Sequence, residues 1–530
     1  MYSKKLKIEI VSYFFLGIFS FYFNYLIGSR GVFPIDTFVH FDSSSRILKN
    51  EIPIRDFWIV HGLVVDYLQS IFFKFLGINW NAYLIHASIF NAVVGIMSLK
   101  IFNHLNLEKI HSILLALCVS VLAYPVSGTP FLDLHSAYFS LIAIYLILLG
   151  VSRGNNLYIF YAILLLGLAF FSKQVPAGYI ILSTAIFILF YCYQIKSFKP
   201  LIFSIYALIL FLSFMLIYLI LTKTPFSEFI LQLFIFPLEI GTERYSNYNL
   251  TLKNIFLDFK FIYLFLIPIV IIVLKKLFEG NYIKKKEFSY FLIIFYFTIS
   301  LIYHQIYTLN QIFIFFLIPI LSAFLIYFLK EVKIFKKKLI INFILIASIL
   351  ITFKYHVRFN EQRKFHELSN QDIKNAVTIN FEKNFFGNLK WISPGFKNPQ
   401  EELEIVEAFY EIIKRDKSAI ILITNYNFFS GLLNVKLHSP SRTYDKISYP
   451  TPKNKFFEKY KIFFKNNLIK NKIQKIYIFN TQDKLDNQYL SHVAFNYLPS
   501  KCYSLEDISK YVKKINLKKC KYLQDEYGKN

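Results

Sequence analysis

The residues best suited to chemistry gather in one polar stretch of the chain, residues 33–62, with the sequence FPIDTFVHFDSSSRILKNEIPIRDFWIVHG. Its candidate side chains are carboxylates and imidazoles: Asp36, His40, Asp42, Asp56 and His61. A carboxylate within hydrogen-bonding reach of a hydroxyl group can accept its proton while the oxygen attacks an electrophile. The same five side chains could instead hold a metal ion, although their spacing matches no established metal-binding motif.

Asp36 is the foremost of these candidates because of its place along the chain. It comes eight residues after the first long apolar segment, 8–28, which puts it at the depth of lipid headgroups. An ionisable side chain at that depth is costly unless it has a role or a partner. A structural alternative is that Asp36 caps a helix expected over 37–48. If that helix is continuous with Asp36, then Asp36 and His40 share one face and Asp42 points elsewhere.

The elements that must position these residues are long apolar segments. The chain has 530 residues, of which 55% are hydrophobic and 17% charged, whereas soluble domains carry about 25% charged residues. This composition excludes a soluble enzyme, a disordered chain and a collagen-like fibre. Segments of about 20 apolar residues have the length of a membrane-spanning helix. We expect eleven spans, at 8–28, 81–103, 110–127, 131–151, 157–173, 177–195, 200–222, 258–276, 287–305, 309–330 and 337–353.

The expected fold is therefore an α-helical polytopic membrane protein, over 1–353, followed by a soluble α/β domain, over 354–530. Polar and charged residues dominate this second part. Its apolar spacing predicts a helix, a strand, a helix and a strand in βαβ-like order. These elements begin at Pro399 and continue at 418–426, 454–470 and 472–480. The domain has no phosphate-binding or hydrolase motif, so we expect a structural or acceptor-binding role.

The charge pattern predicts the orientation of the chain. Its net charge is +26, and lysines crowd alternate short loops such as 282–286 and 330–338. The intervening loops 124–130 and 304–311 carry no Lys or Arg. By the positive-inside rule the N-terminus is cytoplasmic, and eleven spans then place the C-terminal domain in the periplasm of a bacterial inner membrane. No nucleic-acid-binding motif accompanies the basic charge, so nucleic acid is not an expected partner.

Two of the outer loops, 29–79 and 223–254, are long. In the first, the stretch LVVDYLQSIFFKFL (63–76) is apolar but too short to span a bilayer. In the second, FSEFILQLFIFPL (226–238) has the same character. Both are expected to be helices that lie in the membrane interface.

The soluble part contains two cysteines, Cys502 and Cys520, on either side of SLEDISKYV (504–512). We expect that segment to be a helix. A periplasmic domain lies in an oxidising compartment, where such cysteines can form a disulfide. Two unpaired cysteines are the alternative.

Several of these stretches together resemble the GT-C superfamily of membrane glycosyltransferases, of the protein O-mannosyltransferase and lipid A aminoarabinose transferase type. RILKNEIPIRDFWIVHG (46–62) is similar to the pattern A-x-x-L-x-x-G-x-P-Y-R-D-F-x-x-x-x-G-P, and LGLAFFSKQ (166–174) resembles a stretch in which a lysine ends a span at the outer face. An acidic residue after the first span and a soluble domain after the last span also agree. The chain departs from the pattern at Thr37, where a second acidic residue is usual, and at Leu63, where Pro is usual.

The resemblance implies an inverting glycosyltransferase. Its donor would be a sugar on a polyprenyl phosphate, and its acceptor an envelope glycan, lipid A, another lipid or a protein. Asp36 would be the general base. The residues implied in substrate binding are His40, Asp42, Arg55, Asp56, His61, Lys173 and Arg244. No metal ligand is assigned, and a divalent cation stays open as a cofactor.

Among these residues, the cations Arg55, Lys173 and Arg244 could contact the departing phosphate. Each candidate also has a structural alternative. Lys173 could be an interface anchor, Arg244 could pair with a nearby glutamate, and the histidines could be polar contacts.

Two other classes of protein remain as alternatives. A transporter or flippase for a lipid-linked solute would carry ionisable residues in broken spans at mid-membrane. Here the ionisable residues gather at the outer ends of the spans. A polysaccharide polymerase or ligase would usually have a large late outer loop with arginines, whereas the late outer loop, 304–311, is short.

Overall fold

The computed structural model describes residues 2–246, 251–280, 282–308, 314–333, 335–445, 448–481 and 495–524. Contacts divide the chain into two compact units. The first comprises Met1–Ser29, Leu84–Tyr218 and Thr242–Phe365, and the second comprises Arg30–Tyr83, Leu219–Gly241 and His366–Asn530. The first long loop, which the sequence predicts to lie outside the membrane, thus shares a unit with the C-terminal part of the chain.

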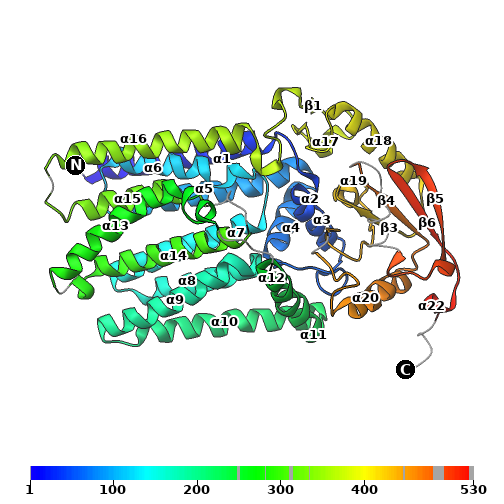
Figure 1. Cartoon of the computed structure of the whole chain (residues 1–530), viewed down its shortest axis with the longest axis horizontal. Helices are drawn as coiled ribbons and strands as arrows, with labels where there is room; N and C mark the ends of the chain where they lie inside the picture. Colours follow the sequence, from blue (N-terminus) through cyan, green and yellow to red (C-terminus); the bar gives the residue numbers. More distant parts are fainter. Residues whose placement is uncertain are drawn as a thin grey trace. The chain divides into compact units, whose positions relative to one another are not determined.

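The first unit consists of long apolar helices, which run side by side in Figure 1. A helix lies at each of the eleven expected spans, although residues 309–313 of the tenth span fall outside the described residues. Within the described residues, nine helices are long and apolar enough to cross a membrane, as expected for an integral membrane protein. The eleven helices are α1 (Tyr2–Gly28), α5 (Trp80–His104), α6 (Lys109–Leu122), α7 (Leu132–Arg153), α8 (Asn156–Ser172), α9 (Gln174–Ile195), α10 (Lys199–Thr222), α13 (Lys260–Phe278), α14 (Lys286–Thr308), α15 (Leu317–Leu329) and α16 (Lys337–His356).

Helix α7 is the most enclosed of the nine long helices, with 89% of its apolar stretch buried. The turn into α8 follows from its sequence. Gly154 takes a left-handed conformation (φ +63°) that ends α7, and the Asn155 side chain accepts a hydrogen bond from the Leu157 N–H at 3.0 Å to begin α8. This tight reversal sets α8 beside α7 and brings the end of α8, at Lys173, back toward the start of α7.

The second unit begins with three short helices: α2 (Pro34–Thr37), α3 (Val39–Leu48) and α4 (Val64–Leu76). Helix α4 confirms the expected helix at 63–76. It buries Asp66 and Gln69 and exposes Phe75, whose side chain is 77% accessible, so it is amphipathic. The second expected interfacial segment is also helical, over α11 (Phe226–Ile230), the π-helical turn Leu231–Ile235 and α12 (Phe236–Ser246).

The C-terminal part of this unit has the expected βαβ core. Strands β3 (Ile420–Thr424) and β4 (Lys475–Phe479) pair in parallel, with α20 (Phe457–Lys470) between them in sequence. Strands β6 (Val512–Leu517) and β5 (Tyr503–Ser509) complete a four-stranded sheet in the order β3-β4-β6-β5, and the added strands are antiparallel. The remaining elements are β1 (Val377–Thr378), α17 (Lys383–Phe386), β2 (Lys390–Trp391), α18 (Pro399–Arg415), α19 (Phe429–Leu433) and α22 (Lys521–Gln524).

The helix expected between the two cysteines is wrong, because this segment is the β5–β6 hairpin. Opposite charges face each other across the strands, with Lys514 Nζ 2.6 Å from a Glu506 carboxylate oxygen and Lys513 Nζ 2.8 Å from an Asp507 oxygen. Such cross-strand pairs stabilise a hairpin. The hairpin brings its two ends together, and Cys502 and Cys520 form a disulfide with their Cα atoms 5.3 Å apart. Of the two alternatives that the sequence left open, the cysteines are thus paired.

Candidate active site

Asp36 lies in the first turn of α2 and is half-buried. The structural alternative, that it caps a helix, is wrong. Phe33 is the N-cap residue and provides no side-chain hydrogen bond, and the backbone N–H of Phe33 donates instead to the Thr37 hydroxyl at 2.9 Å. The start of α2 is thus held by the threonine that replaces the usual second acidic residue. Capping therefore does not explain the carboxylate of Asp36.

The helix expected over 37–48 is interrupted at Phe38, between α2 and α3. Asp36 and His40 therefore do not share a face of one continuous helix, and this prediction is wrong. The His40 ring is fully buried, and its Nδ1 lies 2.7 Å from Asp66 Oδ1 and 2.7 Å from Arg442 Nη2. Arg442 Nη2 also donates to Asp66 Oδ1 at 3.0 Å. His40 thus belongs to a buried cluster with two residues that the sequence analysis did not select.

Burial has opposite effects on two carboxyl groups in this region. It raises the pKa of Asp66 to about 7, although the Arg442 guanidinium opposes the rise. Burial alone would also raise the pKa of Glu51, but the Arg46 guanidinium and hydrogen bonds from His438 and Arg46 lower it to about 2. Glu51 is thus ionised at neutral pH, as a salt-bridge partner must be.

Asp42 is buried in a second cluster on the other side of α3. Its Oδ1 accepts a hydrogen bond from the Ser430 hydroxyl at 2.7 Å, and Arg46 Nη1 lies 3.7 Å from its Oδ2. Arg46 also pairs with Glu51 and stacks over the ring of Phe57 at 3.9 Å. Burial raises the pKa of Asp42, and the nearby Arg46 limits the rise. These contacts fix α3 within its own unit.

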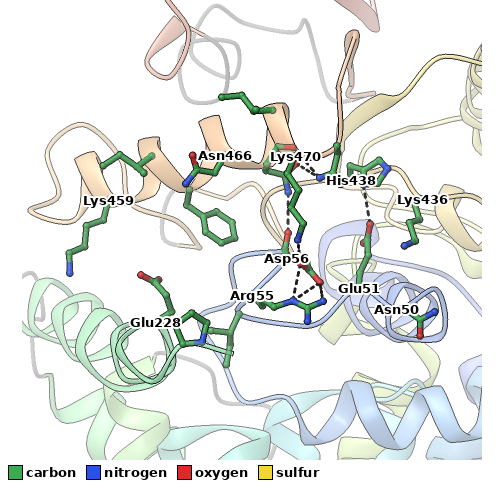
Figure 2. A pocket seen from close by; sticks show the side chains of 17 residues that line it. Asn50, Glu51, Arg55, Asp56, Glu228, Lys436, His438, Lys459, Asn466 and Lys470 are labelled. Atoms are coloured by element: carbon green, nitrogen blue, oxygen red, sulfur yellow. Dashed lines mark hydrogen bonds and ion pairs between the residues drawn. The ribbon is translucent and has the colours of Figure 1, made fainter. Parts of the chain in front are cut away.

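Arg55 and Asp56 form an ion pair, with Arg55 Nη2 2.6 Å from Asp56 Oδ2. Asp56 also accepts from Lys470 Nζ at 2.7 Å and from the Ile52 N–H at 2.8 Å. Burial alone would raise the pKa of Asp56, but these hydrogen bonds and the Lys470 charge lower it to about 2. Arg55 Nη1 donates to the Thr222 carbonyl at 2.7 Å. The two residues line a cavity of about 730 Å³, shown in Figure 2.

Lys173, in the first unit, lies between the end of α8 and the start of α9. Its Nζ lies 2.7 Å from both carboxylate oxygens of Asp133, which is buried in the first turn of α7. His304 Nε2 is 3.4 Å from Asp133 Oδ1. Lys173 was a candidate from the sequence, whereas its partners Asp133 and His304 were not, although each stands, like Lys173, near the end of an apolar segment.

The two remaining candidates are less well defined. His61 is half-buried and lies near the end of the stretch 46–62, shortly before α4. Arg244 lies in α12, but its side chain is outside the described residues. Over the described ranges, no group of three or more His, Cys, Asp or Glu side chains is arranged to hold a metal ion.

No protein-family model matches the chain, and no curated protein matches it in sequence. Among solved structures, the chain is similar to the crystal structure of ArnT from Cupriavidus metallidurans bound to undecaprenyl phosphate. The two chains share 9% sequence identity at a TM-score of 0.49, and the similarity covers 97% of this chain and 98% of that chain. A similarity at this level assigns neither an activity nor a substrate, so the residues themselves must carry the functional argument.

Proposed function

We propose that this protein is a membrane glycosyltransferase that moves a sugar from a polyprenyl-phosphate donor to an envelope acceptor at the outer face of the membrane. The observation that carries the proposal is the position of Asp36. Only the segment 29–33 separates α1 from α2, so the chain holds this half-buried carboxylate near the end of a membrane span. The phosphate of a lipid-linked sugar lies at the same depth.

In the proposed reaction, an acceptor hydroxyl oxygen attacks the anomeric carbon of the donor sugar. The bond between that carbon and the phosphate oxygen breaks, and its electron pair leaves with the polyprenyl phosphate. The proton of the hydroxyl passes to the Asp36 carboxylate, which acts as the general base. A single displacement of this kind inverts the anomeric configuration.

The departing phosphate requires cations or hydrogen-bond donors. Lys173 is our candidate, and its ion pair with Asp133 would hold its ammonium group in a fixed position. His304 completes this group. All three residues lie at or near the ends of apolar helices, whereas a transporter would carry its ionisable residues at mid-membrane. This placement favours a transferase over a transporter or flippase, and it offers no support for a polymerase or ligase.

The proposed orientation has a cytoplasmic N-terminus and a periplasmic C-terminal part, in a bacterial inner membrane. Lysine-rich loops on alternate sides support it. The disulfide between Cys502 and Cys520 supports it as well, because disulfides persist in oxidising compartments.

The direct test is transfer from a panel of labelled polyprenyl-phosphate sugars by the purified full-length protein, with and without EDTA. We expect one donor to be consumed and its sugar to appear on an acceptor in the inverted configuration. Loss of turnover in EDTA would add a divalent cation to the mechanism. If the protein instead moves an intact donor across a vesicle membrane without cleaving it, the transporter class replaces this proposal.

A further inference from the structure

The second unit contains a cavity whose lining residues take no part in the proposed catalytic step. It measures about 730 Å³, which is within the range of about 300–1,000 Å³ typical of ligand sites. Its walls come from the segment 50–56, from the start of α11, from Lys436 and His438 after α19, and from α20. Figure 2 shows labelled side chains from all four segments around this cavity.

Helix α20 presents two different faces. Tyr460, Phe464 and Leu468 are buried in the core of the unit. The cavity is lined by another set of α20 residues, spaced three or four positions apart as one face of a helix requires. Its members are Lys459, Ile462, Phe463, Asn466, Asn467 and Lys470, and Ile469 lies beside them. A helix face that turns amide and aromatic side chains into a cavity is suited to binding a ligand that is both polar and apolar.

The uncharged polar groups of the cavity are carboxamides. Asn467 and Asn471 are engaged, since Asn467 Nδ2 donates to the Asp56 carbonyl at 3.1 Å and Asn471 Nδ2 donates to the Asn467 carbonyl at 3.0 Å. The side chains of Asn50 and Asn466 are exposed and make no hydrogen bond to the described part of the chain. A carboxamide offers one acceptor oxygen and two donor hydrogens, which suits the donor and acceptor hydroxyls of a sugar.

The charges in the cavity are largely paired with one another. Asp56 is held between Arg55 and Lys470, and Glu51 lies 3.4 Å from His438. Both carboxyl groups have a pKa lowered to about 2, so they are ionised and can accept hydrogen bonds from hydroxyl groups. The two lining lysines without an ion pair to any described residue lie on opposite sides of the space in Figure 2, at Lys436 and Lys459. Positive and negative side chains therefore alternate around the cavity. Among the described residues that line it, no two free cations lie together, as the binding of a phosphate group would require.

The cavity also has apolar surface. Ile462 is 57% exposed, and Phe463 packs edge-on against the buried Trp58 with ring centroids 5.9 Å apart. Phe463 is only partly buried, so its position is set by the tryptophan while part of its surface stays accessible. The C–H groups of a sugar ring can pack on such an aromatic surface.

We propose that this cavity is an acceptor subsite that binds a neutral, hydroxyl-rich glycan of the cell envelope. The inference rests on the proposed transferase function, and it narrows the acceptor from a glycan, lipid or protein to a glycan. Asn50 and Asn466 bind hydroxyl groups, and Phe463 contacts the apolar side of a ring.

The test is direct binding of neutral di- to tetrasaccharides of glucose, galactose, mannose and N-acetylglucosamine to the full-length protein, by saturation-transfer NMR and calorimetry. We expect at least one saccharide to bind, and we expect Asn466→Ala to weaken its binding about tenfold or more. Because Asn466 is exposed, replacing it should leave the hydrophobic core of the second unit intact. Lys461→Ala is the matched control, because Lys461 is on α20 but does not line the cavity.

Binding needs neither the donor nor Asp36, so Asp36→Asn should bind the saccharide as well as the wild type does. The subsite is overturned if no saccharide binds the folded protein, if Asn466→Ala binds as tightly as the control, or if only inorganic phosphate binds. Glycan binding without transfer from any donor would refute the transferase function but leave the subsite in place. Transfer to an acceptor without saccharide binding would refute the subsite alone.

Discussion

Lys173 Nζ lies 2.7 Å from both oxygens of the Asp133 carboxylate, so two helix ends separated by 40 residues are joined by a buried ion pair. The Asp133 side chain is 4% exposed and that of Lys173 is 16% exposed. Removing one member of a buried pair leaves the other charge without compensation, at a cost of about 3–5 kcal/mol. From the sequence, Lys173 was considered as an interface anchor. The structure shows instead that it forms a buried ion pair with Asp133.

This relationship predicts that Lys173→Ala lowers the thermal stability of the detergent-solubilised protein, because Asp133 stays buried. The double variant Lys173→Met with Asp133→Asn should recover most of that stability, since both charges are gone. The kinetics of donor use then test whether Lys173 has a second role in binding the donor. If Lys173 also contacts the donor phosphate, the stable double variant will still show a reduced kcat/KM. A single alanine variant as stable as wild type would contradict the ion-pair argument.

The disulfide predicts a stability difference that can be measured directly. Cys502 and Cys520 are 18 positions apart, and closing a loop of this size stabilises a domain by about 3 kcal/mol in the chain-entropy model. Replacing both by serine should lower the free energy of unfolding by about that amount. Alkylation of denatured, unreduced protein should modify only Cys118 and Cys192, which are buried and unpaired in the fold. Modification of all four cysteines would refute both the pairing and the periplasmic location inferred from it.

Glu51 predicts a loss of stability in acid. Its pKa is lowered to about 2 in the fold from an ordinary value of 4.5. A carboxyl group with a lowered pKa contributes its full stabilisation above about pH 4.5, and this contribution is lost as the pH falls toward 2. A shift of this size corresponds to about 3 kcal/mol. The unfolding free energy of wild type should therefore fall between pH 5 and pH 3, and Glu51→Gln should reduce that dependence.

Tryptophan fluorescence can follow this unfolding, because all three tryptophans, Trp58, Trp80 and Trp391, are buried in the second unit. Glu458→Gln is the matched control. Glu458 is on α20 with its side chain 74% exposed, so its variant should keep the pH dependence of wild type. An unchanged pH dependence in Glu51→Gln would show that this carboxyl group is not the source of the effect.

The helices of the first unit could be predicted because a membrane span needs about 20 apolar residues, a signal contained in one local window. The elements α18, β3, α20 and β4 were predictable for the same reason, since their apolar periodicity is local. The β5–β6 hairpin was not, because Glu506 and Lys514 support each other only across strands. The hydrophobic spacing of a seven-residue strand does not reveal those pairs.

The partners of the candidate residues were hidden for a related reason. Asp66 and Arg442 are 376 positions apart, and no spacing rule links them. Asp66 interrupts an apolar stretch, which marks it as unusual, but Arg442 follows no pattern. The interruption at Phe38 was equally invisible, because the residues on either side of it are compatible with one helix. The sequence thus located the candidate stretch, whereas the contacts of its members come from the tertiary structure.

The central prediction is that Asp36→Asn abolishes sugar transfer while the protein remains folded and still binds its donor. Asparagine keeps the size of the side chain but cannot accept a proton at neutral pH, so it removes the base alone. Loss of a positioned base costs about 10²–10⁴-fold in rate. The start of α2 depends on the hydrogen bond between Thr37 and the Phe33 N–H, so the substitution should not unwind it. The matched control is Asp372→Asn, since Asp372 is an exposed helix cap that asparagine replaces well. The measurement is single-turnover transfer from the active donor, alongside thermal melting of each variant. An Asp36→Asn protein with wild-type turnover would refute the assignment and leave His61 as the next candidate base, since Asp42 and Asp56 are already held by Arg46 and Arg55.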